Sequence, residues 1–113
     1  MSLRVHEGKA GALEPIAREM AARTSHEDGA LAYEFHISGD KRRCKLFEEY
    51  RDPAAAVAHL SGPVVGELVP ALLTLADLES FEVFGDAGPD VMAIVHGFGA
   101  SAYDFWHGLS EPG

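Results

Sequence analysis

The sequence predicts an α+β fold in which four strands and two packed helices follow one another in the order βαββαβ. Three observations lead to this prediction. Residues 30–37 and 44–50 alternate apolar and polar side chains on either side of a turn, as two paired strands do. Apolar stripes at helical spacing stand before and after this pair. Short strand-like segments open and close the pattern, at residues 3–6 and 79–85.

The first strand is expected at LRVH, residues 3–6, and a turn in HEGKAG follows it. The next helix should begin near residue 12, because Pro15 is tolerated only close to a helix start. It should end around Thr24, before the polar run SHEDG. One stripe of this helix is apolar and consists of Leu13, Ile16, Ala17 and Met20.

The central hairpin is the clearest local signal. Within ALAYEFHI, residues 30–37, every second side chain is large and apolar, which gives the strand one strongly apolar face. Gly39 and Asp40 suit a turn because both accept unusual dihedral angles. CKLFEEY, residues 44–50, is expected to return as the antiparallel partner. The sequence does not define the register, and a slip of one residue would exchange the two faces.

Asp52 and Pro53 predict the start of the second helix, because the carboxylate accepts free N–H groups and proline has no N–H to lose. The apolar stripe of this helix consists of Pro53, Ala56, Val57 and Leu60. His59 lies about 110° from the centre of that stripe, so we expect it on the flank of the buried surface.

Gly62 and Pro63 interrupt the chain, and residues 64–78 are expected to continue as helix with a kink at Pro70. Residues 79–85, ESFEVFG, are the predicted fourth strand.

A C-terminal extension, residues 86–113, then adds a short helix opened by Pro89 and a last strand at residues 101–106. Its aromatic residues are expected to cover a pocket mouth or a partner subunit, and these are Tyr103, Phe105 and Trp106.

The βαββαβ order is that of the ferredoxin-like arrangement, with helices on one face of an antiparallel four-stranded sheet. We expect a single domain over residues 1–113, with its core at about residues 3–85. The strands offer apolar residues on both sides, since Phe47 opposes Leu46, and Phe81 and Val83 oppose Glu82 and Phe84. Such a two-sided sheet favours a homodimer that pairs sheet face to sheet face, with a ligand pocket between sheet and helices or between subunits.

Composition narrows the class of partner. The net charge is −9, from 9 basic and 18 acidic residues, which argues against nucleic acid and anionic membrane surfaces. The longest apolar run is far short of the roughly 20 residues of a membrane helix. The first residues lack the apolar core of a secretory signal. We therefore expect a soluble, cytoplasmic protein.

Sulfur and histidine patterns give no sign of a metal site or a disulfide. Cys44 is the only cysteine, and we expect a buried thiol, although the neighbouring Arg43 and Lys45 leave a reactive thiol open. The six histidines show neither helical i, i+4 spacing around a carboxylate nor an HxH pattern. No glycine-rich phosphate loop follows a strand.

Three residues are candidates for catalysis: His59, Glu48 and Tyr50. A histidine near its ordinary pKa can remove a proton from a phenol or hydroquinone around neutral pH. The alternative is a histidine that bonds a carbonyl or carboxylate and only stabilises the fold. Glu48 and Glu49 point to opposite sheet faces, so at most one of them can face a pocket.

A buried glutamate on this strand would need a partner, for which Arg42, Arg43, Arg51 and His36 are candidates. The candidates for substrate binding are Tyr33, His36 and Phe47. A structural role in the core remains the alternative for the tyrosines.

Three passages resemble the antibiotic biosynthesis monooxygenase family of the dimeric α/β barrel superfamily. They are DGALAYEF at residues 28–35, LFEEYRDPAAAVAHL at residues 46–60, and Gly8-Lys9 before the first helix. The second passage is the most specific. Together the passages span roughly residues 3–85, and the extension lies outside the usual family core.

The resemblance implies a homodimer and, in enzymatic members, oxygenation of phenolic or quinol-like aromatics, often with no metal or flavin. A haem-degrading branch uses an asparagine on the first strand, whereas this chain has Val5 and no asparagine there. In that branch a tryptophan stands at the position of His59, so haem degradation is disfavoured.

Two functions remain open at the level of sequence. The first is a cofactor-free monooxygenase that acts on a small aromatic molecule. The second is a non-catalytic dimeric module that binds a small molecule or has a structural role.

Overall fold

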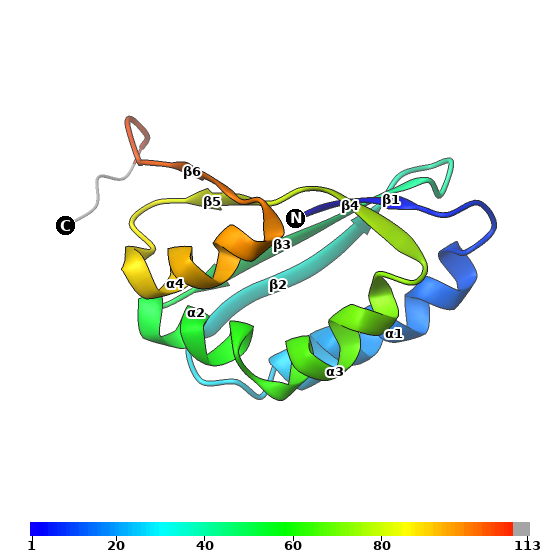
Figure 1. The fold of residues 1–113 in the computed structure, drawn as a ribbon, viewed down its shortest axis with the longest axis horizontal. Helices are drawn as coiled ribbons and strands as arrows, with labels where there is room; N and C mark the ends of the chain where they lie inside the picture. The colour runs from blue at the N-terminus through cyan, green and yellow to red at the C-terminus, as the bar shows by residue number, and fades with distance from the viewer. Residues whose placement is uncertain (110–113) are drawn as a thin grey trace.

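The structure, a computed structural model, describes residues 1–109 and contains one four-stranded antiparallel sheet in its N-terminal part. The strands lie in the order β2-β3-β1-β4 (Figure 1). This is the predicted ferredoxin-like arrangement. The strand bounds are β1 Ser2–Val5, β2 Ala30–Ile37, β3 Arg43–Tyr50 and β4 Ala76–Ser80.

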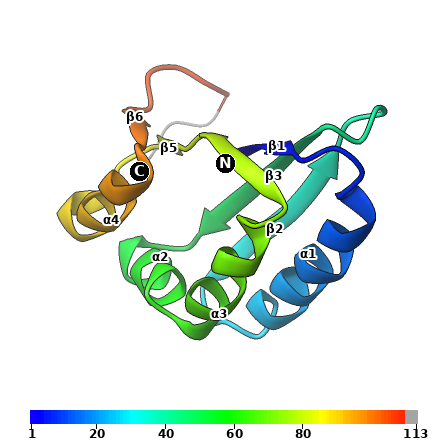
Figure 2. The same cartoon turned by 45° about the vertical axis from the view of Figure 1, so that its right-hand side comes forward.

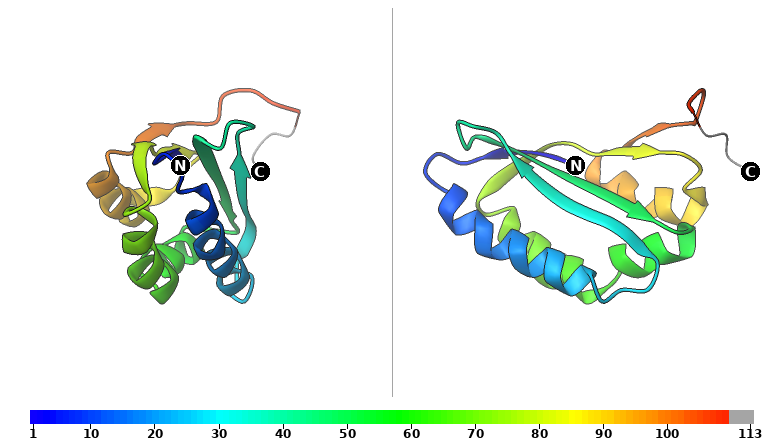
Figure 3. Two further views of the ribbon diagram at one scale, coloured as in Figure 1. Left: turned by 90° about the vertical axis from the view of Figure 1, so that its right-hand side faces the viewer. Right: turned by 180° about the vertical axis from the view of Figure 1, so that it is seen from behind.

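Three helices accompany this sheet: α1 (Ala10–Thr24), α2 (Pro53–Leu60) and α3 (Pro63–Leu72). α1 and α3 pack side by side on one sheet face, as Figures 2 and 3 show. Burial of apolar area between this face and the helices is the main stabilising contribution. The core between these layers contains Leu3, Val5, Leu13, Met20, Cys44, Val64, Leu72 and Ala76.

The end of the second helical region differs from the prediction. α3 ends at Leu72, and the expected strand at residues 79–85 divides into β4 and a separate β5 (Glu82–Phe84). Ala76 and Leu78 lie opposite Val5 and Leu3 of β1. Pairing with β1 places these apolar side chains in the core, so strand pairing prevails over the helical pattern.

β5 and the C-terminal extension together form a second, smaller sheet. After β5 the chain forms α4 (Gly88–Val95) and a 3₁₀ turn (His96–Phe98), and then β6 (Ser101–Tyr103). β5 and β6 pair in parallel, and α4 is the crossover that parallel pairing requires. The predicted helix and strand are present, although β6 is shorter than expected. Trp106 lies beyond β6 with 83 % of its surface exposed.

The open face of the large sheet is less apolar than the sequence analysis expected. Arg4, Lys45, Glu34 and Asp77 occupy exposed positions there, and Phe47 is the aromatic exception with 56 % of its surface exposed. The expectation of apolar residues on both faces was wrong because Phe81 and Val83 leave this sheet. They pack instead with α4 in a second core around Val91 and Val95.

No single helix in residues 1–109 is long and apolar enough to span a membrane. Only α2 and α3 taken together reach the required length and composition, and their axes differ by 56°.

Candidate functional site

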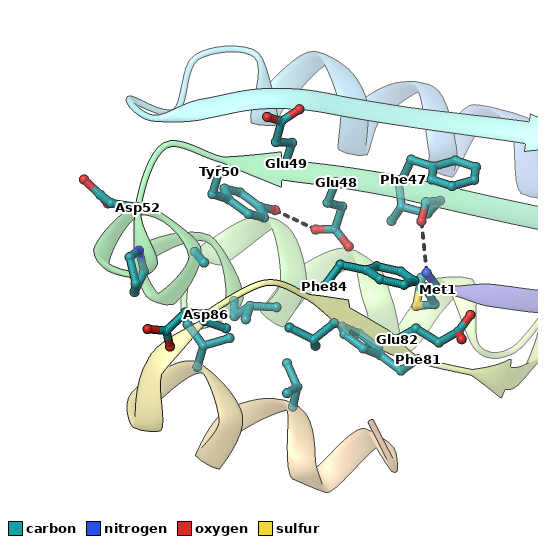
Figure 4. A pocket seen from close by; sticks show the side chains of 18 of the residues that line it. Met1, Phe47, Glu48, Glu49, Tyr50, Asp52, Phe81, Glu82, Phe84 and Asp86 are labelled. Carbon is teal, nitrogen blue, oxygen red and sulfur yellow. Dashed lines mark hydrogen bonds between the residues drawn. The ribbon is translucent and has the colours of Figure 1, made fainter. Parts of the chain in front are cut away.

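An open groove runs between the end of β3 and the C-terminal extension (Figure 4). Its volume is about 430 Å³, within the range of small-molecule sites. The walls combine a few polar groups with many apolar ones, among them Glu48, Tyr50, Phe81, Phe84, Val91 and Val95.

The groove exists because β3 is longer than its neighbour β1. The ladder between β1 and β3 reaches Lys45, so the later residues of β3 have no strand of the large sheet on that side. The chain instead passes through β5 to α4, which packs against α2. β5 and the extension thus supply the wall that faces the free end of β3. The aromatic residues of the extension were expected to cover a pocket mouth or a partner subunit, but Tyr103, Phe105 and Trp106 are not among the groove-lining residues of the described part of the chain.

Glu48 and Tyr50 form the polar centre of the groove. Both project from β3 toward the extension, whereas Glu49 points away, as alternation along a strand requires (Figure 4). The Tyr50 hydroxyl donates a hydrogen bond of 2.5 Å to Glu48 Oε1. Burial, together with the charge of Glu48, raises the pKa of Tyr50 far above its ordinary value. Tyr50 is therefore a phenol donor at every physiological pH.

His59 lies behind this pair and is buried, with only 1 % of its surface exposed. The expectation that it would flank the buried surface was wrong, because the loop before β2 and the inner face of β3 both close over it. Its Nδ1 lies 2.8 Å from Glu27 Oε1, and its Nε2 lies 3.5 Å from Glu48 Oε1. Among the residues described, His59 is not one of those that line the groove.

Two tyrosine rings enclose the imidazole. The centroid of His59 lies 5.2 Å from that of Tyr33 and 5.5 Å from that of Tyr50. Burial raises the pKa of Tyr33, and the charges of Glu48 and Glu27 raise it further, while the nearby Thr24 hydroxyl opposes this rise. That hydroxyl is buried and has no hydrogen bond of good geometry within residues 1–109. Tyr33 packs against the core and, within residues 1–109, is not one of the residues that line the groove.

The remaining candidates lie on the other sheet face. His36 is exposed, pairs with Glu34 at 3.2 Å, and contacts the ring of Phe47 edge-on. Phe47 reaches the groove rim, but His36 does not line the groove. The buried partners of Glu48 are His59 and Tyr50, not the arginines or His36 that the sequence suggested.

Glu27 is the site residue that sequence reasoning missed. It lies in the polar run SHEDG, which reads as an ordinary surface loop. Its contact with His59 joins residues 32 positions apart in the chain. No local pattern distinguishes Glu27 from its neighbours Asp28 and His26.

A second hollow, of about 480 Å³, lies at the other end of the sheet and is lined mainly by exposed charged residues. Asp77 pairs there with Arg4 at 2.8 Å and with His6 at 2.9 Å. Cys44 is buried, and burial raises its thiol pKa, which agrees with the expected unreactive thiol. Residues 1–109 contain no group of three or more His, Cys, Asp or Glu placed to hold a metal ion.

Comparison with solved structures shows the same fold. MupZ from Pseudomonas fluorescens is 22 % identical with a TM-score of 0.78, and the match covers 98 % of this chain and 90 % of MupZ. Since that coverage is nearly complete, it includes the extension. A conserved protein of unknown function from Bacteroides thetaiotaomicron, described as a possible oxidoreductase, is 22 % identical (TM-score 0.63, covering 67 % and 82 %). Rv0793 from Mycobacterium tuberculosis is 26 % identical (TM-score 0.60, covering 68 % and 80 %).

Among curated proteins, none matches the chain. A family model does match it: the model of antibiotic biosynthesis monooxygenases covers residues 1–71, which is more than half of the 113 residues and includes Glu27, Glu48, Tyr50 and His59. The chain therefore belongs to the antibiotic biosynthesis monooxygenase family.

Proposed function

We propose that the protein is a cofactor-independent monooxygenase that oxidises a small aromatic substrate, a phenol, quinol or anthrone, in the groove beside β3. The observation that carries the proposal is the pairing of Glu48 with Tyr50 on the wall of a largely apolar groove. Family membership supports the reaction class. Phe81 and Phe84 offer apolar surface for a flat ring.

Glu48 is the general base in this proposal. Its side chain is 15 % exposed, so it is partly desolvated and still reaches the groove. When it takes a proton from the substrate, it becomes a poorer acceptor for the Tyr50 hydroxyl. Tyr50 is then free to donate to the oxyanion that has formed on the substrate. The Tyr50 hydroxyl thus exchanges Glu48 for the substrate oxyanion as its hydrogen-bond acceptor in the step in which Glu48 takes the proton.

The substrate supplies the electrons. For an anthrone, Glu48 removes a proton from the ring CH₂ group, and the resulting anion transfers one electron to O₂. The substrate radical and superoxide combine to form a C–O bond, and the peroxide anion takes a proton back. Loss of water leaves a ketone, so CH₂ plus O₂ becomes C=O plus H₂O. One oxygen atom enters the product and the other leaves as water.

Oxygen uptake with a panel of anthrones and hydroquinones tests this proposal. We expect one O₂ consumed per anthrone. Glu48→Gln should lower kcat by about 10²- to 10⁴-fold, since it keeps the shape and removes the base. Glu34→Gln, an exposed carboxylate on the opposite sheet face, is the matched control and should keep full activity. Absence of oxygen uptake across the panel, or full activity of Glu48→Gln, contradicts the proposal.

The second candidate is a non-catalytic module that binds a small apolar molecule. The enclosed position of His59, with carboxylates near both ring nitrogens, favours it, because such a histidine also serves a purely structural role. Calorimetric binding of an anthrone without any oxygen uptake would select this function. Binding followed by turnover selects the monooxygenase.

We further propose that the working unit is a homodimer. Phe47 on the open sheet face supports this, as does the exposed stacked pair formed by Phe84 of β5 and Tyr103 of β6, whose ring centroids lie 5.4 Å apart. Large exposed aromatic side chains are typical of subunit interfaces.

A further inference from the structure

Four side chains form a continuous line through the protein, from the groove to another surface. Tyr50 and Glu48 stand on the groove wall. His59 follows behind them, fully enclosed. Glu27 ends the line, and its side chain keeps 26 % of its surface exposed. In residues 1–109, neither His59 nor Glu27 lines the groove. The solvent that reaches Glu27 is therefore not the solvent of the groove.

The contacts along this line are short at both ends and longer in the middle. Glu27 Oε1 lies 2.8 Å from His59 Nδ1, and the Tyr50 hydroxyl lies 2.5 Å from Glu48 Oε1. His59 Nε2 and Glu48 Oε1 are 3.5 Å apart, which exceeds a normal hydrogen bond. Protonation of Glu48 would turn this contact into a donor–acceptor pair with the Nε2 lone pair. A small side-chain rotation then suffices to close it.

The loop that carries Glu27 is held firmly against α2. The Glu27 N–H donates to the Thr24 carbonyl at 2.9 Å. Gly29 has φ +86°, and a Cβ there would lie 2.6 Å from the Cβ of Ala55. Ala55 and His59 are four residues apart on one face of α2. The close approach at Gly29 thus places Glu27 beside His59.

We propose that Glu27 and His59 form a reversible proton relay that takes over the proton taken up by Glu48 and returns it when the peroxide anion forms. The inference rests on the proposed role of Glu48 as the base in the groove. It assigns a function to Glu27 and explains why a titratable ring is enclosed between two carboxylates. The relay requires a resting His59 that carries its proton on Nδ1, from where it donates to Glu27.

The relay moves one proton and leaves every group as it began. Protonated Glu48 donates its proton to Nε2 of His59 and returns to a carboxylate. The imidazolium passes its Nδ1 proton to Glu27. When the peroxide anion forms, the same transfers run in reverse: Glu27 returns a proton to Nδ1, Nε2 returns one to Glu48, and Glu48 protonates the peroxide. A bound substrate that fills the groove keeps solvent from accepting the proton there, and this is when the relay is needed.

Nitrogen-15 NMR of the histidine rings tests the relay without any substrate. His59 is identified by its proximity to the rings of Tyr33 and Tyr50. In alkaline solution, where imidazole rings are neutral, we expect the wild-type ring to be protonated on Nδ1. In the Glu27→Gln variant the amide can either accept from Nδ1–H of His59 or donate to Nδ1. A substantial fraction of the His59 rings should therefore shift to the Nε2–H tautomer. An Nε2–H ring in the wild type, or an unchanged ring in Glu27→Gln, overturns the relay.

Turnover provides the second measurement. Glu27→Gln should lower kcat by about tenfold or more with KM nearly unchanged, while Asp28→Asn, in the same loop and paired with Arg51, should match the wild type. Equal kcat in Glu27→Gln and wild type rejects the relay. If no substrate of the panel is oxidised, the proposed function fails, and the tautomer measurement still decides whether Glu27 controls His59.

Discussion

At the scale of single residues, the site depends on where two phenols and one imidazole are buried. Tyr33 and Tyr50 lie against His59, and the carboxylates of Glu27 and Glu48 complete the cluster. A carboxylate beside a buried phenol strongly disfavours a second negative charge. The cluster therefore keeps the tyrosine protons in place.

This cluster predicts how stability changes in alkaline solution. An unfolded tyrosine ionises near pH 10, whereas burial raises the pKa of Tyr33 and Tyr50 above that in the folded protein. Above about pH 10 the unfolded chain therefore binds fewer protons than the folded one, so the free energy of unfolding should fall as pH rises toward the folded pKa. Denaturant titrations at several pH values measure this fall.

The variant Tyr50→Phe provides the control for the alkaline prediction. It removes one of the two buried phenols, so its unfolding free energy should fall less steeply above about pH 10. Absorbance of tyrosinate should show the buried phenols ionising together with unfolding. Ionisation of all three tyrosines near pH 10 in the folded protein would contradict the burial argument.

At the scale of elements, the loop between α1 and β2 matters because it touches α2 so closely. Gly29 is the contact point, for both its positive φ and the short distance to Ala55 exclude a side chain. The start of α2 is fixed independently, since Asp52 accepts the Ala55 N–H at 2.8 Å. The loop and the capped helix together hold the two ends of the Glu27–His59 contact.

Substitution of this glycine tests that packing. Gly29→Ala should lower the free energy of unfolding by about 2 to 4 kcal/mol, from the strained dihedral and the clash with Ala55. Gly39→Ala is the matched control, because nothing lies within 4 Å of the added carbon and its φ is not positive. It should change stability by less than about 0.5 kcal/mol. Equal losses in the two variants would show that the loop does not pack on α2.

At the scale of the whole molecule, the C-terminal extension adds part of a groove wall to the core of sheet and helices. β5 and α4 stand opposite the free end of β3, and the second core around Val95 fixes α4 against α2. The exposed Phe84, Tyr103 and Phe105 lie on this same part of the chain. The domain limits and the cytoplasmic location suggested by the sequence stay predictions.

The proposed homodimer is tested by the mass of the protein in solution. Light scattering after size-exclusion chromatography should give twice the mass of one chain, which is 12.1 kDa. Phe47→Lys should shift the protein toward monomer if the open sheet face is the interface. Tyr103→Lys should instead shift the protein toward monomer if the extension forms the interface between the two subunits. A monomeric wild type at high concentration contradicts the dimer.

Local patterns in the sequence determined most of the fold. Alternation in residues 30–37 and 44–50 predicted the central hairpin, and Asp52-Pro53 predicted the start of α2, because both signals act between residues close in the chain. The same strand alternation placed Glu48 and Tyr50 on one face. The family, too, was recognisable from short passages in the core.

Only the tertiary structure decided what surrounds those residues. His59 became a core residue instead of a flanking one because Glu27, 32 positions away, and β3 close over it. The second groove wall came from β5 and from α4, whose sequence resembles any short apolar helix. Such contacts join distant parts of the chain through burial and charge pairing, which leave no periodic trace in the sequence. The sequence thus determined most of the elements and the shared strand face of Glu48 and Tyr50, and long-range packing decided which of the candidate residues face the groove and which lie behind it.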